Sequence, residues 1–184
     1  MLELQLSPFR NLETERLILR RLRIEDAADW FSIRSDARAY RFLQKDLDTS
    51  IDDTIAVIKV VNANFESNNG MGWAITLKGT DRLVGVINLW NFDKYNHRSE
   101  IGYTLNHDYW NKGIMSEALQ TVMDFAFTEL KFHSVEANIN PDNIGSQKVL
   151  EKNGFVREGY FKENFHYNGS FYDSAIYSRL APKP

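Results

Sequence analysis

Two spacings of apolar residues alternate along this chain, and together they predict a sheet interleaved with helices. Residues 99–105 alternate in the manner of a β-strand, which puts Ile101 and Tyr103 on one face. Between residues 114 and 130, apolar side chains recur at helical spacing, which predicts an amphipathic helix. A strand therefore runs into a helix through a short loop at residues 106–113, and the other elements are expected to pack around this junction.

Similar patterns extend over the rest of the chain. Further strands are predicted at residues 12–21, 72–77, 82–90, 134–140, 156–163 and 171–178. Further helices are predicted at residues 26–34, 50–67 and 143–154. The polar residues 91–98 are expected to form a loop, and Asn168-Gly169 is expected to turn the last hairpin.

The order of these elements predicts the sheet. Residues 134–140 return after the helix at 114–130, so this strand is expected to lie parallel to residues 99–105. The other strands follow one another through short turns, which favours antiparallel pairs. We therefore predict an α/β (α+β) fold: a single domain over residues 1–184, with a core at about 12–180, built from a mixed, mostly antiparallel sheet of about seven strands and about four helices.

Length and composition suit one soluble domain. Of the 184 residues, 43% are hydrophobic, which is enough for a single core. A net charge of −3 argues against a nucleic-acid binder that relies on a basic surface. The absence of cysteine excludes disulfides, thiolate metal ligands and a cysteine acyl-enzyme. No basic leader is present and no run approaches about 18 apolar residues, so we expect a cytoplasmic protein with no signal peptide and no membrane partner.

The loop at residues 106–113 predicts an anion site. A strand that enters a helix through a glycine directs free backbone N–H groups and the positive end of the helix dipole at one point. The sequence contains no GxxxxGK[ST] string, so this loop is not a P-loop. A different phosphate-bearing ligand is therefore expected.

The loop also matches a known pattern. It reads Tyr109-Trp110-Asn111-Lys112-Gly113-Ile114-Met115-Ser116-Glu117-Ala118 and resembles the acetyl-CoA pyrophosphate loop of the GNAT family of N-acetyltransferases. The aromatic pair, the Lys-Gly and the following Glu-Ala are similar to the Rim-type branch, the ribosomal-protein N-acetyltransferases. Two later segments, Asn143-Ile144-Gly145-Ser146 and Lys152-Asn153-Gly154-Phe155, follow at the distances that this branch shows, and the resemblance covers residues 13–180.

The resemblance implies that the parallel strand pair splays apart and binds acetyl-CoA as co-substrate. The pantetheine arm is then expected on the backbone of Tyr103, Thr104 and Leu105. The pyrophosphate is expected on the backbone of Asn111, Lys112, Gly113, Ile114, Met115 and Ser116. Beyond the loop, the expected acetyl-CoA contacts are Asn140, Asn143, Ser146, Lys148 and Lys152. Lys148 and Lys152 would add charge near the ribose phosphate, and ordinary solvated surface lysines are the alternative.

Two loop positions depart from the family pattern. Asn111 stands where the branch commonly has glycine, and Met115 where it has glycine or alanine. Asparagine is the most tolerant residue after glycine if this position needs a positive φ. The Met115 side chain must point away from the phosphates.

The reaction that the resemblance implies is direct attack of an amine on the acetyl thioester, which requires removal of a proton. An α-amine has a pKa of about 7.7–8.0 and is mostly protonated at neutral pH. Glu100 is the best candidate base because related enzymes place a carboxylate on this strand, and an ordinary surface glutamate is the alternative. The four histidines have no metal-ligand spacing partner, and no metal is expected.

Ser146 matches the serine of the family's Asn-x-x-Ser pattern. Because the leaving thiolate resembles that of a cysteine, with a pKa of about 8.5, a hydrogen bond to sulfur is sufficient assistance. We therefore assign Ser146 to solvating the sulfur. The alternative is that Asn143 and Ser146 only satisfy the first turn of their helix.

Three features of the sequence bear on the acetyl acceptor and its binding site. Residues 39–48 show no clean period and are a candidate wall of the acceptor site by analogy with the family, an ordinary loop being the alternative. In the Rim-type branch an acidic residue of the last hairpin has been linked to base catalysis; this chain has Phe165 there, with Glu163 two residues away. We favour a protein N-terminal amine as acceptor. A small-molecule amine or antibiotic, and a catalytically weak CoA-binding sensor, remain as alternatives, and the sequence leaves both a monomer and a homodimer open.

Overall fold

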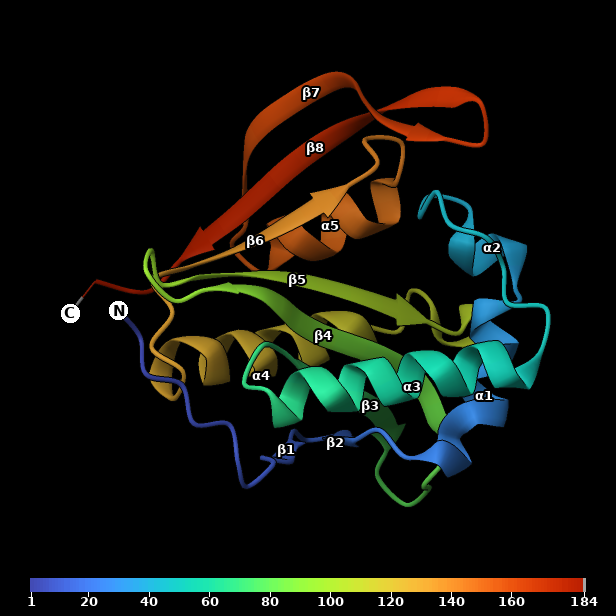
Figure 1. Cartoon of the computed structure of the whole chain (residues 1–184), viewed down its shortest axis with the longest axis horizontal. Coiled ribbons are helices and arrows are strands. Elements are labelled where there is room, and N and C mark those ends of the chain that lie inside the picture. Colours follow the sequence, from blue (N-terminus) through green and yellow to red (C-terminus); the bar gives the residue numbers. More distant parts are fainter. Residues whose placement is uncertain (184) are drawn as a thin grey trace.

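The computed structural model describes residues 1–183, which form one eight-stranded sheet covered by helices (Figure 1). The strands are β1 (Leu12–Glu13), β2 (Leu17–Arg21), β3 (Met71–Leu77), β4 (Leu83–Asp93), β5 (Arg98–Leu105), β6 (Ser134–Ile139), β7 (Val156–Tyr167) and β8 (Ser170–Leu180). The helices are α1 (Ala27–Arg34), α2 (Ala37–Tyr40), α3 (Ile51–Glu66), α4 (Ile114–Thr128) and α5 (Ile144–Lys152), with single 3-10 turns at Ile24–Asp26 and His107–Tyr109.

The strand order is β1-β2-β3-β4-β5-β6-β8-β7. Every neighbouring pair is antiparallel except β5 and β6, which run parallel. The parallel pair arises because α4 carries the chain from the end of β5 back to the start of β6. The predicted mixed, mostly antiparallel sheet with a central parallel pair is therefore confirmed.

The single strand predicted over residues 12–21 is wrong, because the chain turns at residues 14–16 and forms two antiparallel strands, β1 and β2. The structure also adds the four-residue helix α2, which is too short to show a period in the sequence. The expectation of a loop over residues 91–98 is partly wrong, because β4 extends to Asp93 through a register shift after Trp90. Asn91 takes φ +51° at this irregularity, a conformation that asparagine tolerates well.

Helix α4 covers one face of the sheet. Its buried side chains are Ile114, Met115, Ala118, Leu119, Val122, Met123, Phe125, Ala126 and Phe127. They pack with the inward residues of the central strands in the larger hydrophobic core. Each large apolar side chain buried there contributes roughly 1.5–3 kcal/mol of transfer free energy, which fixes the start of α4 against the end of β5.

Helices α1 and α3 cover the opposite face through a second, smaller core that includes Trp30 and Ile58. Helix α3 begins with a capping box: the Asp53 N–H donates to the Ser50 hydroxyl at 3.3 Å, and the Ser50 N–H donates to the Asp53 carboxylate at 2.9 Å. This reciprocal pair satisfies two N–H groups that the helix cannot satisfy itself. The sheet is thus sandwiched between α4 with α5 on one side and α1 with α3 on the other (Figure 1).

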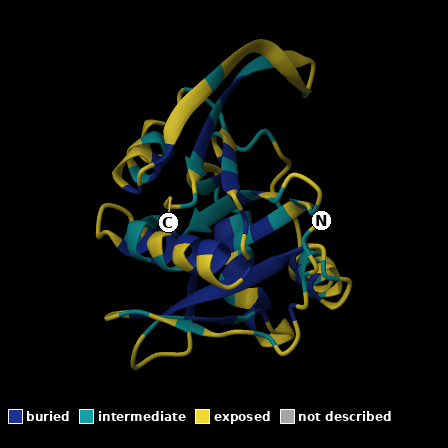
Figure 2. Ribbon diagram, turned by 90° about the vertical axis from the view of Figure 1, so that its left-hand side faces the viewer, coloured by how far each residue is buried: buried dark blue, intermediate teal, exposed yellow. Residues whose placement is uncertain are grey.

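The β7–β8 hairpin extends beyond the rest of the molecule; β7 is largely exposed, whereas much of β8 and the central strands are buried (Figure 2). Its turn is the predicted one, with Asn168 at φ +47° and Gly169 at φ +77°. Within residues 1–183, no helix combines the length and the apolar character needed to cross a bilayer.

Candidate active site at the fork in the sheet

The central parallel strands are paired only at their beginnings. Arg98, Ser99 and Glu100 of β5 lie opposite Ser134, Val135 and Glu136 of β6, and no further register pair joins the two strands. Beyond Glu100, β5 stays paired with β4 and β6 stays paired with β8. The predicted splay is therefore present as a fork, and the Glu100–Glu136 pair is its root.

The backbone alternation of β5 decides which peptide groups face the fork. The Asn106 N–H donates to the Val84 carbonyl of β4 at 2.9 Å. In an antiparallel ladder alternate residues turn their backbone groups to the same neighbour, so Thr104 also faces β4 whereas Tyr103 and Leu105 face the fork. The Leu105 carbonyl already accepts a hydrogen bond from the Trp110 indole at 2.9 Å. Of the three backbone positions that the family resemblance suggested, Tyr103 is the one most open to an added strand.

A side-chain hydrogen bond spans the fork. The Tyr103 hydroxyl of β5 lies 2.9 Å from the Ser146 hydroxyl of α5. Burial raises the pKa of the Tyr103 phenol, which keeps it protonated. Ser146 is only 8% exposed, and its N–H donates to the Asn143 side chain at 3.1 Å, so Asn143 caps α5 as predicted.

The start of α4 carries no side-chain cap. Gly113 occupies the cap position at φ +76°, and Asn111 takes φ +58°, the positive value for which asparagine is suited. The first N–H groups of a helix have no partner within the helix. Met115 is 5% exposed and packs in the larger core, so its side chain points away from these groups. The N–H groups of Ile114, Met115 and Ser116 therefore form a positive helix end of the kind that binds anions.

A carboxylate in the first turn of α4 is neutralised by the β1–β2 connection. Glu117 accepts hydrogen bonds from the Thr14 hydroxyl and from the Arg16 backbone N–H and guanidinium, the last at 2.7 Å. Burial by itself would raise the pKa of Glu117, but the hydrogen bonds from Thr14 and Arg16 lower it overall. Arg16 also donates to the Lys112 carbonyl at 3.0 Å. Arg16 thus fixes the loop and cancels a charge that would repel phosphates.

The remaining residues of the expected acetyl-CoA site lie at the surface. The Lys112 ammonium lies over the Tyr109 ring, 5.5 Å from its centroid. Lys148 and Lys152 are exposed on α5, and their direction toward a ribose phosphate stays a prediction. The Asn140 side chain accepts a hydrogen bond from the Asp142 N–H at 2.8 Å, which shapes the turn into α5.

Glu100 stands at the root of the fork, half-buried, on the sheet face that α3 covers. The Asn91 amide donates to its carboxylate at 2.8 Å. Burial raises the pKa of Glu100, and the neighbouring Glu136 carboxylate raises it further; Asn91 and Lys45 oppose that rise without cancelling it. The sequence suggested Glu100 but not Asn91, which lies in a segment that was expected to be a loop.

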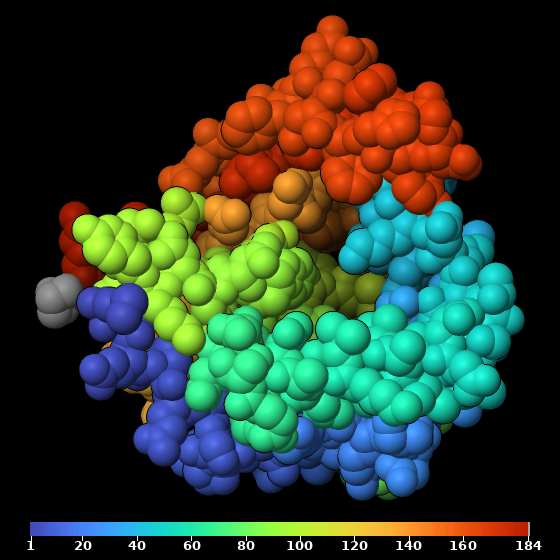
Figure 3. Space-filling view, in the orientation of Figure 1, coloured from blue at the N-terminus to red at the C-terminus, as the bar shows by residue number. Residues whose placement is uncertain are grey.

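A hollow lies in front of this sheet face, between α3, the segment around α2 and the β7–β8 hairpin (Figure 3). Two pockets occur along it. One of about 500 Å³ is lined by Asn64, Asn69, Trp90, Asn91, Phe92 and Asp93. The other, of about 230 Å³, is lined by Ala37, Tyr40, Arg41, Gln44, Lys45, Leu47, Tyr167 and Tyr172. Residues 39–48, the candidate acceptor wall, thus contribute five of their side chains to the second pocket.

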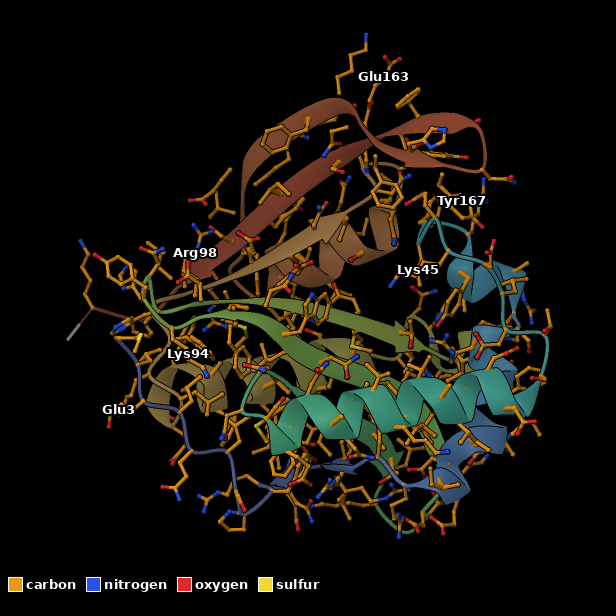
Figure 4. All side chains as sticks on the ribbon, viewed as in Figure 1. Glu3, Lys45, Lys94, Arg98, Glu163 and Tyr167 are labelled. Atoms are coloured by element: carbon orange, nitrogen blue, oxygen red, sulfur yellow. The ribbon has the colours of Figure 1, made fainter. Side chains whose placement is uncertain are left out.

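The hairpin brings no carboxylate from Glu163 into this hollow. Glu163 is exposed at the outer edge of the hairpin (Figure 4), at φ +51°, in a bulge between Phe161 and Phe165. Its N–H donates to the Asp173 carboxylate at 2.7 Å. The base role suggested for an acidic hairpin residue of the Rim-type branch therefore has no counterpart in Glu163.

The features present fit a long, amide-rich, diphosphate-bearing thioester. The fork offers unpaired backbone groups to the amides, the uncapped start of α4 offers N–H groups to phosphate, and hydroxyls meet where the two strands diverge. No three His, Cys, Asp or Glu side chains of residues 1–183 lie together in a way that could hold a metal ion.

Fold and site together define an acetyltransferase of the GNAT architecture. A family model described as an acetyltransferase (GNAT) domain matches residues 16–156, and the chain belongs to this family. It is an N-acetyltransferase with Rim-type relatives, and enzymes of this family use acetyl-CoA.

Individual relatives agree with this assignment. The uncharacterized N-acetyltransferase YoaA of Bacillus subtilis (strain 168) is 31% identical over 172 residues, which cover 94% of this chain and 97% of that protein. The ribosomal-protein-serine acetyltransferase of Escherichia coli (strain K12) is 31% identical over 100 residues, or 54% of this chain and 56% of that protein. A crystal structure of a GNAT-family acetyltransferase from Bacillus anthracis, 30% identical, matches with a TM-score of 0.83 over 93% of this chain and 98% of that chain.

Proposed function

We propose that this N-acetyltransferase moves acetyl from acetyl-CoA directly to a primary amine, and that its acceptor is the α-amine of a protein N-terminus. The proposal rests on the position of Glu100, a half-buried carboxylate at the last paired rung before β5 and β6 diverge. The choice of a protein N-terminus is supported by the similarity to a ribosomal-protein-serine acetyltransferase.

Acetyl-CoA supplies an activated acetyl thioester. Its amide-bearing arm would pair with the fork-facing peptide groups of Tyr103, as an extra strand pairs with a sheet edge. Its diphosphate would accept hydrogen bonds from the N–H groups at the start of α4. These contacts would bring the thioester to the root of the fork, beside Glu100.

Glu100 would act as general base. The acceptor amine, with an ordinary pKa of about 7.7–8.0, arrives mostly as an ammonium ion. The raised pKa of Glu100 narrows the gap to that of the amine and makes the carboxylate a better proton acceptor at the working pH. Asn91 would hold the carboxylate in place through its hydrogen bond.

Ser146 would stabilise the departing sulfur. In this scheme the Tyr103 phenol, the stronger acid of the hydroxyl pair, would donate to the Ser146 oxygen. The Ser146 proton is then free for the thiolate, which needs little more than a hydrogen bond because its pKa lies near 8.5. Tyr103 is a positioning residue in this scheme and Ser146 touches the reacting sulfur.

The acceptor class is tested by following release of free CoA thiol with short peptides and with polyamines, and by locating the acetyl group by mass spectrometry. Acetylation of peptide α-amines in preference to polyamines supports the proposal. A preference for polyamines would show that the acceptor is a small-molecule amine and not a protein N-terminus. No turnover of any amine would indicate a CoA-binding sensor.

Ligand binding is measured separately, by thermal unfolding with added CoA. A ligand at 100 times its Kd stabilises the folded state by about 2.7 kcal/mol, so Tm is expected to rise with CoA concentration. A Tm that stays constant would contradict the acetyl-CoA site itself.

A further inference from the structure

The smaller pocket of the hollow combines cations, neutral donors and aromatic rings but holds no carboxylate. Arg41 and Lys45 contribute the charge, Gln44 the amide, and Tyr167 and Tyr172 the hydroxyl-bearing rings. From this set we infer that the pocket binds an anionic group of the acceptor, the side-chain carboxylate of an acidic residue within the first three positions of the N-terminus. The inference rests on the proposed peptide acceptor and specifies its sequence.

Neither of the two cations forms an ion pair with a carboxylate of the described residues. Among the ion pairs of residues 1–183, none includes Arg41 or Lys45, whereas nearby Arg34 is held by Asp48 at 2.6 Å. Asp46, the adjacent carboxylate, instead accepts a hydrogen bond from the Tyr167 hydroxyl at 2.8 Å. Two unpaired cations that line one pocket attract an anion, whose charge they would neutralise.

The walls of the pocket are fixed from both sides. The Arg34–Asp48 pair and the hydrogen bond from Arg34 to the Tyr40 hydroxyl at 3.0 Å hold the segment after α2 against α1. The Tyr167–Asp46 hydrogen bond ties the hairpin tip to the same segment. A pocket with fixed walls loses less entropy on binding than one that must form around its ligand.

The pocket also lies within reach of the candidate base. Lys45 points from the segment after α2 toward the hollow (Figure 4), and its charge lowers the pKa of Glu100. Such an interaction between partly exposed groups acts over roughly 10 Å. An extended peptide advances about 3.3–3.6 Å per residue, so an amine at Glu100 puts one of its first three side chains near Lys45.

The experiment compares alanine peptides that carry one glutamate at position 1, 2 or 3 with peptides that carry glutamine there. At saturating acetyl-CoA, the wild-type kcat/KM is expected to be roughly threefold to tenfold higher for glutamate at one position, the range for one or two partly exposed ion pairs. Equal values at all three positions, with turnover intact, would overturn the inference alone. No turnover of any peptide would overturn the proposed acceptor and the inference with it.

Variants distinguish the pocket from other sources of the preference. In Lys45→Ala and Arg41→Ala the glutamate-to-glutamine ratio should fall toward 1, and in Lys45→Glu it should fall below 1. The ratio within one variant cancels any change in the base or in acetyl-CoA binding. Lys59→Ala, at an exposed lysine of α3, is the matched control and should keep the wild-type ratio. A raised KM for acetyl-CoA with an unchanged ratio would assign the cations to CoA phosphates and overturn the inference.

Discussion

The hydroxyls of Tyr103 and Ser146 lie 2.9 Å apart and join β5 to α5 across the fork in the sheet. We expect Tyr103→Phe to lower kcat by about fivefold, the value of one hydrogen bond of about 1 kcal/mol, with little change in KM for acetyl-CoA. If Tyr103 acts through Ser146, the double variant Tyr103→Phe/Ser146→Ala should be no slower than Ser146→Ala alone. Steady-state kinetics measure all three. Additive losses would show that the two hydroxyls act independently, and a lower Tm with unchanged kcat would leave only a structural role.

Glu100→Gln should slow the reaction most in a definite pH window. Above the raised pKa of Glu100 and below that of the amine, the wild type has its carboxylate and the amine still needs a base. There we expect a loss of about 100-fold or more in kcat. Above pH 8 the amine is largely unprotonated and the difference should shrink. Equal rates for the two proteins across the pH range would remove Glu100 from the mechanism.

The same substitution should raise stability at neutral pH. Because burial raises the pKa of Glu100 in the folded state, the carboxyl favours folding below its ordinary pKa and that contribution is lost as pH rises through the raised value. Glutamine cannot ionise. The Tm of Glu100→Gln should therefore match that of the wild type near pH 4 and exceed it at pH 7 to 8. A lower Tm at neutral pH would mean that the charged form is favoured by folding.

Asn91→Ala should shift the pH dependence of kcat and leave the maximal kcat unchanged. Asn91 lowers the pKa of Glu100 by donating to its carboxylate, so its loss should move the acidic limb of the kcat profile to higher pH. Asn11→Ala, at an exposed asparagine near the N-terminus, is the control and should leave the limb in place. If Asn91→Ala instead lowers the maximal kcat and leaves the acidic limb of the profile at the same pH, Asn91 contributes to acceptor binding and not to the pKa of Glu100.

Arg16→Gln should weaken acetyl-CoA binding although Arg16 is far in sequence from the loop. Glu117 would then stand unneutralised in the first turn of α4. A charge at a helix end contributes about 0.3–1 kcal/mol, so KM for acetyl-CoA should rise roughly twofold to fivefold. Adding Glu117→Gln should reverse part of this rise. If the double variant has an even higher KM, Arg16 acts by holding the Lys112 carbonyl and not by cancelling charge.

The sequence predicted the elements that carry strong local signals. Helix α4 was found because its apolar residues recur over four turns, and α3 because residues 50–67 also carry an apolar face at helical spacing. The parallel placement of β5 and β6 followed from the crossover between them. The turn between β1 and β2 was missed because residues 14–16 carry no glycine or proline, and α2 was missed because four residues display no period.

The residues of the candidate site likewise fall into those that local motifs predicted and those that they did not. Local motifs indicated the loop with Gly113, the cap at Asn143 and the serine at position 146. The partners Asn91 and Arg16 were not found, since each reaches the site from a strand or turn that carries no motif. The positive φ of Asn91 and the bulge beside it have no counterpart in hydrophobic spacing.

The sequence by itself determined the family pattern, the order of strands and helices and the residue types available for the chemistry, because these depend on spacing along the chain. Only the tertiary structure decided that pairing between β5 and β6 stops at Glu100, that Tyr103 meets Ser146 and that Met115 turns into the core. These outcomes depend on which side chains share the limited space between packed layers. That competition involves residues far apart in sequence, which no local pattern records.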